Sequence, residues 1–244
     1  MSKKEITFNK ISFFDLNYNQ VIDKLKYGGL LVIPSGPGLS TLEKDKQYSN
    51  ALENSDIAIF DSSYFCLLLK ILKFINVKKF SGYLFLKKLL NDQTQKKKSF
   101  YLIDSSASEK SFNKKYLQSI GILKSKHYIA PFYNKKSIND NKLLLTLKKY
   151  KPKFIIINIG SGIQEPLGLY LKKKLNYNPI IICSGAAISF LTKSQANIND
   201  FWDKFYLGWF LRILNNPLVF IPRYFNSFNL FFLVLKSKIK IKNI

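Results

Sequence analysis

Histidine and cysteine are scarce in this chain of 244 residues. The single histidine is His127, and the two cysteines, Cys66 and Cys183, lie in apolar segments without a CxxC spacing. One histidine excludes a multi-histidine metal site, and no cluster of Asp, Glu and Cys has the spacing of a zinc or calcium site. Two isolated cysteines do not make a disulfide framework and are typical of small buried side chains in a reducing compartment. We therefore predict no metal and no cofactor.

Long apolar runs are absent as well. The N-terminal residues Met1–Thr7 lack the apolar core of a signal peptide. The longest apolar run, Leu230–Leu235, is far below the roughly 20 residues that a membrane-spanning helix needs. The default expectation is a cytoplasmic location.

Arginine is nearly missing, although the chain is strongly basic. The formal net charge is +24, yet the 39 basic residues include only two arginines, Arg212 and Arg223, both near the C-terminal end. The lysine excess, in a chain also rich in Ile and Asn, is typical of an AT-rich genome, so much of the charge is expected on solvated faces. We predict no nucleic-acid partner, because the sequence has no aromatic-basic RNA motif and no helix-turn-helix spacing.

Five short apolar runs, rich in Ile, Val and Phe, are each followed by a segment of helical pattern. Strands that alternate with helices predict an α/β fold, here a Rossmann-like, mostly parallel sheet flanked by helices, with the strand ends gathered at one edge. Ser40 with Glu43, and Ser106 with Glu109, fit the Ser-x-x-Glu capping box and predict helix starts after the first and third runs. The predicted strands are Leu30–Pro34, Ile57–Phe60, Phe100–Ile103, Phe154–Ile159 and Ile180–Cys183.

The loop after the fourth run is the most informative segment. Gly160 and Gly162 let the backbone turn sharply and approach a ligand closely. Gln164 and Glu165 follow at the start of the next helix, where open α/β sheets hold their substrates. The alternative is an ordinary strand-to-helix turn in which Glu165 complements the helix dipole.

Asp61 ends the second run and is held at the rim of the same predicted site. A carboxylate on a rigid strand end can act as a general base that deprotonates an acceptor hydroxyl. The alternative is a structural role, in which Asp61 caps the following helix or binds loop amides. Asp104 ends the third run and invites the same two interpretations, with more weight on the structural one because Ser106 already explains its loop.

The composition changes near residue 201, where aromatic side chains begin to mix with cations. We therefore predict an α/β domain over residues 1–200 and an aromatic, basic, helical appendage over residues 201–244 that associates with a membrane. Trp209 precedes Arg212 by about one helical turn, so its ring is expected to pack on the arginine stem or to meet lipid. The alternative is a surface helix docked on the core, and both can hold at once.

Several motifs occur in a characteristic order. They are a Pro-containing first loop at Ile33-Pro-Ser35, the strand-end Asp61, Lys78-Lys-Phe-Ser-Gly82, the loop Gly160-Ser-Gly-Ile-Gln-Glu165, and Gly208-Trp-x-x-Arg212 followed by Pro217 and Arg223-Tyr224. In this order, from about Gly29 to Tyr224, the chain resembles the WecG/TagA/CpsF family of glycosyltransferases. The Gln-Glu loop and the Trp-x-x-Arg region are the most specific parts of the resemblance.

The resemblance implies an inverting, metal-independent transfer of a sugar from a nucleotide donor to a lipid-linked acceptor glycan. The donor would be a UDP-sugar, typically UDP-N-acetylmannosamine or a relative. The resemblance also implies a peripheral location on the inner face of the cell membrane, an anionic membrane surface as a partner, and a role in cell-surface polysaccharide synthesis. Formation of a homo-oligomer is left open.

By the same resemblance, Asp61 matches the candidate general base, and Gln164 and Glu165 match a pair associated with the donor and acceptor pocket. Arg212 and Arg223, with Trp209 nearby, correspond to arginines thought to hold the acceptor diphosphate near the membrane. Further residues expected to contact the substrates are Ser35, Gly36, Lys79, Gly160, Ser161, Gly185 and Ser189.

Several positions depart from the family pattern. Ser35 stands for the Asn of Thr-Pro-Asn, Gly162-Ile163 for the Pro-Lys of Gly-Ser-Pro-Lys-Gln-Glu, Lys79 for an arginine, and Ser189 for the Asp of Phe-Asp-Phe. These departures leave the donor sugar open. The alternatives are a catalytically altered or inactive relative that binds a nucleotide sugar, and another nucleotide-dependent α/β enzyme.

Overall fold

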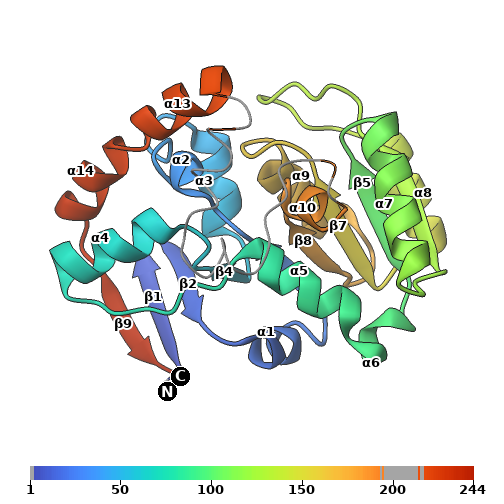
Figure 1. Ribbon diagram of the computed structural model, residues 1–244, viewed down its shortest axis with the longest axis horizontal. Helices are drawn as coiled ribbons and strands as arrows, with labels where there is room; N and C mark the ends of the chain where they lie inside the picture. The colour runs from blue at the N-terminus through green and yellow to red at the C-terminus, as the bar shows by residue number, and fades with distance from the viewer. Residues whose placement is uncertain (1–2, 193, 195–213, 215–216) are drawn as a thin grey trace.

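A single sheet organises the chain, and helices cover both of its faces (Figure 1). The computed structural model describes residues 3–192, 194, 214 and 217–244. Within these residues, nine strands follow the order β6-β5-β7-β8-β3-β4-β2-β1-β9. The strands are β1 (Lys4–Phe8), β2 (Ile11–Asp15), β3 (Gly29–Val32), β4 (Ile57–Ile59), β5 (Phe100–Asp104), β6 (Ser125–Ile129), β7 (Phe154–Asn158), β8 (Ile180–Cys183) and β9 (Lys240–Asn243).

The predicted α/β class is confirmed, since the strands from β6 to β2 in the sheet pair in parallel. All five predicted strands are present, as β3, β4, β5, β7 and β8. Every residue of β4, β5, β7 and β8 is buried. Continuous apolar runs therefore mark these strands because helices cover the sheet on both sides.

The strands that the sequence did not reveal lie toward the two sides of the sheet. β1 pairs antiparallel with both β2 and β9, and β6 pairs with β5. Asn9 and Lys10 connect β1 to β2 with positive φ angles of 46° and 65°. Positive φ at both central residues is the geometry of a two-residue type I′ turn, here made without the Asn-Gly pair that usually signals it.

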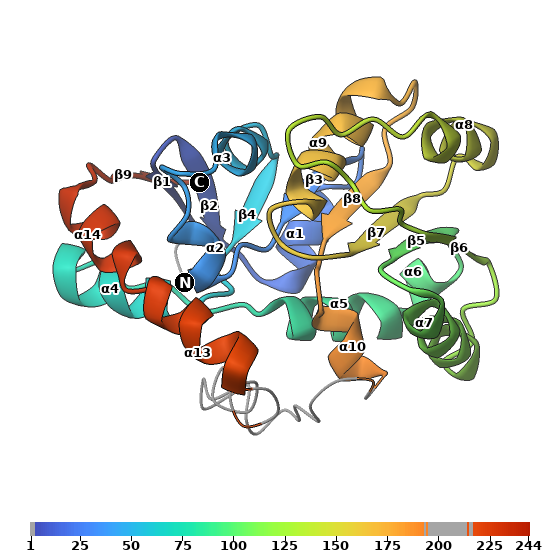
Figure 2. The same ribbon diagram turned by 90° about the horizontal axis from the view of Figure 1, so that it is seen from above.

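Two helical layers enclose the sheet (Figures 1 and 2). Side chains from α2, α3, α4, α8, α9 and α14 join one buried apolar cluster, and side chains from α1, α5, α7 and α10 join the other. The sheet lies between the two clusters. The helices are α1 (Tyr18–Lys24), α2 (Gly36–Leu39), α3 (Lys46–Glu53), α4 (Ser63–Lys73), α5 (Gly82–Asn91), α6 (Gln93–Lys96), α7 (Ala107–Ser119), α8 (Asn141–Tyr150), α9 (Gln164–Lys174), α10 (Ala187–Leu191), α13 (Pro217–Asn226) and α14 (Asn229–Lys236).

Of the two predicted capping sites, one is confirmed. Ser106 caps α7, and its Oγ accepts a hydrogen bond from the backbone N–H of Glu109 at 3.2 Å. The prediction at Ser40 is wrong, because Ser40 ends the short helix α2 and donates its hydroxyl to the carbonyl of Pro37 at 2.7 Å. Ser35 caps α2 instead, so that helix begins five residues earlier than the pattern predicted.

The end of the chain belongs to the α/β core. Leu230, Leu233 and Val234 of α14 are buried in the same cluster as α4, and β9 extends the sheet. The predicted appendage over residues 201–244 is therefore not confirmed, because its apolar C-terminal run packs inside. The predicted boundary at residue 201 lies outside the described residues. In the described part of the chain, no helix combines the length and hydropathy needed to cross a bilayer.

Candidate active site at the carboxyl edge of the sheet

The carboxyl ends of the parallel strands bring the predicted site residues to one edge. The loop after β3 begins the Ser35–Gly38 turn, β4 is followed by Phe60 and Asp61, and β7 and β8 lead into the Gly160 and Gly185 loops. This arrangement follows from the parallel pairing of β4, β3, β8 and β7. Residues far apart in the sequence thus border one region, as in the binding sites of open α/β sheets.

Asp61 is anchored at the beginning of α5 and does not cap the helix that follows it. Its Oδ1 accepts a hydrogen bond from the backbone N–H of Gly82 at 2.8 Å. Ser62 caps α4 instead, accepting from the N–H of Phe65 at 3.2 Å. A carboxylate at a helix N-terminus is stabilised by the unpaired amides there. The strand end and α5 together fix the position of Asp61.

Asp61 and Lys79 both act on the thiol of Cys66 in α4. Burial, together with the negative charge of Asp61, raises the pKa of this thiol to about 12, and the positive charge of Lys79 opposes the rise. The predicted general base and the predicted phosphate-binding lysine are thus both within electrostatic range of Cys66.

Gln164 joins the loop after β7 to the loop after β8. Its Oε1 accepts from the backbone N–H of Gly185 at 2.7 Å, and its own carbonyl accepts from the thiol of Cys183 at 3.3 Å. Gly185 has a φ of +55°, which favours a residue without a Cβ. Because Gln164 is only 3% exposed, its side chain serves mainly to hold these two loops together.

Glu165 is completely buried behind the same loop. Its Oε2 accepts from the backbone N–H of Gly162 at 2.7 Å, and its Oε1 accepts from Gln164 Nε2 at 3.0 Å and from Ser161 Oγ at 3.4 Å. Burial raises the pKa of this carboxyl from 4.5 to about 7, although the hydrogen bonds from Gly162, Gln164 and Ser161 act in the opposite direction. The loop thus encloses a carboxylate that can change its charge near neutral pH.

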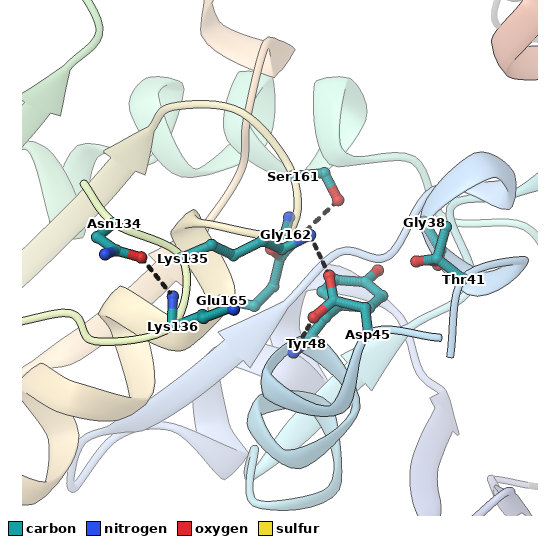
Figure 3. Close-up of polar contacts among 10 residues, drawn as sticks. All are labelled: Gly38, Thr41, Asp45, Tyr48, Asn134, Lys135, Lys136, Ser161, Gly162 and Glu165. Carbon is teal, nitrogen blue, oxygen red and sulfur yellow. Dashed lines mark hydrogen bonds and ion pairs between the residues drawn. The ribbon is translucent and has the colours of Figure 1, made fainter. Parts of the chain in front are cut away.

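Tyr48 is a member of this cluster that the sequence did not reveal (Figure 3). It lies on α3 and is completely buried. Burial and the negative charge of Glu165 raise the pKa of its hydroxyl well above the usual value, while Ser161 lowers it. No sequence signal marks Tyr48, because an aromatic side chain on the apolar face of a helix is typical of an ordinary core residue.

The short helix α2 joins the two halves of the edge. A Cβ at Gly36 would lie 2.9 Å from Ser62 Oγ, next to Asp61. A Cβ at Gly38 would lie 2.5 Å from the Tyr48 hydroxyl and 3.2 Å from Ser161 Oγ. The two glycines therefore let α2 touch the Asp61 half with one end and the Gln164-Glu165 half with the other.

Comparison with protein families identifies the family of the chain. A family model described as glycosyl transferase WecG/TagA/CpsF family matches residues 6–244. The chain belongs to the WecG/TagA/CpsF family of glycosyltransferases. Comparison with individual curated proteins finds no match. The recognised resemblance is thereby confirmed over nearly the whole chain, as is the prediction of an enzyme that transfers a sugar.

In this WecG/TagA/CpsF chain, Asp104 belongs to a closed structural network. Its Oδ1 accepts from Asn113 at 2.7 Å and from Asn158 at 3.2 Å, and its Oδ2 lies 2.8 Å from Nδ1 of His127. Asn158 in turn accepts from Ser184 Oγ at 3.0 Å. Asp104 is fully buried, so these contacts link the ends of β5 and β7 to the middle of β6 and to the loop after β8.

The structure describes some of the other predicted site residues and not all of them. Ser189 on α10 donates its hydroxyl to Glu109 Oε2 at 3.0 Å, and Gly160 is exposed with open space around it. Arg223 lies within α13. Trp209 and Arg212 lie outside the described residues. Among the residues that the structure describes, no three His, Cys, Asp or Glu side chains group as ligands for a metal ion.

Proposed function

We propose that the chain transfers a sugar, of the N-acetylmannosamine type, from a UDP-sugar to a lipid-linked acceptor in cell-surface polysaccharide synthesis. The observation that carries this proposal is the position of α2 between the two halves of the site. Gly36 adjoins Ser62 at one end of this helix, and Gly38 adjoins Ser161 at the other. A transferase must hold a base and a donor at a fixed separation. Asp61 supplies the base on one side of α2, and the Gln164-Glu165 loop borders the donor on the other.

Asp61 is the proposed general base. Its carboxylate takes the proton from an acceptor hydroxyl while that oxygen attacks the anomeric carbon of the donor sugar. The bond from the anomeric carbon to the diphosphate oxygen breaks, and its electron pair leaves with UDP. Attack occurs opposite the leaving group, so the anomeric configuration inverts. The anchoring of Asp61 by Gly82 supports this role, because a base must be held within hydrogen-bond reach of the hydroxyl.

The donor is proposed to lie across the strand ends, against Ser35, Gly36, Gly160, Ser161 and Gly185. Lys79 and loop amides would face its diphosphate without a divalent metal ion. The exposure of Gly160 and Ser161 supports this part, since a loop that binds substrate must be reachable from solvent. The buried Gln164 would act chiefly by fixing the Gly185 loop.

A membrane-facing surface is proposed on α4, α13 and α14. Each helix carries exposed apolar side chains at helical spacing. The exposure is 92% at Phe74, directly after α4, and 88% at Leu218 and 81% at Phe225 in α13. The short helix α2 packs against all three helices, so this surface adjoins the first loop of the site. The apolar surface residues are Leu67, Ile71, Phe74, Leu218, Ile221, Phe225, Phe228, Phe232 and Leu235.

Charge favours an anionic lipid surface as the occupant of this face. The chain carries a formal net charge of +24, so two copies repel each other, whereas anionic headgroups attract it. A lipid-linked acceptor would then be presented beside α2. We accordingly propose a peripheral location on the inner face of the cell membrane, with Arg212 and Arg223 near the acceptor diphosphate and Trp209 at the lipid interface.

A transfer assay tests the proposed function. The purified full chain is incubated with a panel of UDP-sugars and a lipid-diphosphate-linked acceptor, in the presence of EDTA. We expect transfer from at least one donor, and NMR of the product should show an inverted anomeric centre. Binding of UDP without transfer or hydrolysis of any donor would support the inactive relative and overturn the enzymatic proposal.

A further inference from the structure

Glu165 acts from inside the protein. Its side chain is completely buried, and its carboxylate is engaged by Gly162, Gln164 and Ser161 of its own loop. A buried carboxylate with these partners shapes the loop and does not reach a substrate. Gly160 and Ser161 are exposed on the outer side of the loop, while the Ser161 hydroxyl reaches inward to the enclosed Glu165.

Tyr48 also encloses Glu165, and its buried hydroxyl lowers the stability of the fold. In the described part of the chain, its buried hydroxyl makes no hydrogen bond of regular geometry, although Glu165 and Ser161 lie beside it. Leaving a buried hydroxyl without a partner destabilises a fold by roughly 1–3 kcal/mol. Phenylalanine would fill the same space without that cost, so stability does not explain the hydroxyl.

The Tyr48 hydroxyl lies against α2 at Gly38. A Cβ at this glycine would be 2.5 Å from the hydroxyl oxygen and 3.2 Å from Tyr48 Cζ. Contacts this short force one side to move, and the fully buried Tyr48 ring has little room to do so. The hydroxyl therefore sets how closely α2 approaches the Gln164-Glu165 loop.

A second contact closes the cluster from outside. Lys135, on the segment before α8, pairs with Asp45, and its Nζ would lie 3.2 Å from a Cβ at Gly162 (Figure 3). Asp45 also caps α3, accepting from the backbone N–H of Tyr48 at 3.1 Å. Asp45 thus links Lys135, on the outside of the loop, to α3, the helix that carries Tyr48.

We propose that Tyr48 and Glu165 are positioning residues that hold α2 at a fixed separation from the Gln164-Glu165 loop, with Gly38 as their contact point. Gly36, at the other end of this contact, adjoins Ser62 and hence Asp61. The cluster thereby keeps Asp61 and the Gln164-Glu165 loop at a fixed separation. This inference rests on the proposed function, because the separation matters only if Asp61 and the Gln164-Glu165 loop both act on the substrates.

The test compares steady-state kinetics of Tyr48→Phe with those of the wild type. Misplacement of reacting groups by about 1 Å costs up to roughly 100-fold in rate. We expect kcat of Tyr48→Phe to fall about 10-fold while KM for the donor changes by less than about 3-fold. The matched control is Tyr177→Phe, which also removes a buried hydroxyl without a hydrogen-bond partner among the described residues, but lies before β8, at the opposite edge of the sheet. The control should keep wild-type kcat.

A double variant tests the contact itself. Gly38→Ala places a methyl group against the Tyr48 hydroxyl, so kcat should fall by about 100-fold. Combining it with Tyr48→Phe removes the clashing oxygen, and activity should recover to within about 5-fold of Tyr48→Phe alone. A merely structural role of Tyr48 predicts no such recovery.

Stability measurements keep the outcomes distinct. Urea unfolding of Tyr48→Phe should show a free energy of unfolding equal to or above that of the wild type. Wild-type kcat in Tyr48→Phe, or a double variant no more active than Gly38→Ala, would overturn the positioning role. Failure of the proposed function is a different result, since the wild type itself would then transfer no sugar.

Discussion

Replacement of Glu165 by glutamine should remove a pH dependence from the stability of the fold. Burial raises the pKa of the Glu165 carboxyl from 4.5 to about 7 in the folded protein. The folded state therefore binds this proton more tightly than the unfolded chain does. The stabilisation from this proton is fully present below about pH 4.5 and is lost as the pH rises through about 7.

The expected size follows from the same pKa difference. Each unit of pH over which only the folded state keeps the proton is worth about 1.4 kcal/mol, so Glu165 should account for roughly 3 kcal/mol between about pH 4.5 and pH 8. Glutamine does not titrate. It also leaves Gly162 or Ser161 without an acceptor, which costs about 1–3 kcal/mol at every pH. That loss changes the level of stability and leaves the slope untouched.

Urea unfolding of wild type and Glu165→Gln at about pH 5 and about pH 8 measures the effect. The free energy of unfolding of the variant minus that of the wild type should rise by roughly 2.5 kcal/mol over this interval. Glu43→Gln is the matched control, because the same change is made on an exposed side chain and should alter stability by less than about 0.5 kcal/mol. A difference between Glu165→Gln and wild type that stays constant with pH would refute the reasoning.

Three further predictions concern the base, the buried network and the apolar surface. Asp61→Asn should lower kcat by about 100-fold or more without loss of fold, whereas Asp23→Asn, on exposed α1, should not change it. Asp104→Ala should lower the free energy of unfolding by about 3 kcal/mol or more in a urea titration, because three buried donors lose their acceptor. Phe225→Glu should weaken sedimentation with anionic vesicles, whereas Phe132→Glu, which changes a still more exposed side chain outside this surface, should not; the reverse result would contradict the proposed surface.

The sequence was sufficient for the centre of the sheet and insufficient for its sides. Strands covered on both faces need continuous apolar residues, so β7 and β8 were visible as runs of isoleucine. β6 and β9 are largely polar or exposed, and the β1-β2 turn uses Asn9-Lys10, which is not a typical turn pair. Their strand structure depends on pairing partners distant in the sequence, which local pattern does not encode.

The site was predictable where chemistry is carried by residue type and strand position. Asp61, Gln164 and Glu165 follow buried strands, and the parallel topology then gathers them at one edge. The detailed contacts were not predictable, because they depend on packing between elements. The local pattern suggested Asp61 as a cap for the next helix, yet it anchors α5, twenty-one residues further along. Tyr48 enters through the buried face of α3, where the local sequence does not distinguish it from an ordinary core residue.

Gly162 gives a final argument about how this chain differs from the family pattern it resembles, in which proline occupies that position. Gly162 has a φ of +86° and donates its N–H to Glu165 Oε2 at 2.7 Å. Proline holds φ near −65° and has no N–H, so it cannot form this loop. Gly162→Pro should therefore leave Glu165 short of a partner and lower the unfolding free energy by about 3 kcal/mol, whereas Gly160→Ala, with open space around its Cβ, should change it little. An unchanged stability of Gly162→Pro would show that the loop does not need the Gly162–Glu165 bond. The enclosure of Glu165 therefore depends on glycine at position 162, which supplies both the positive φ and the N–H that the loop needs.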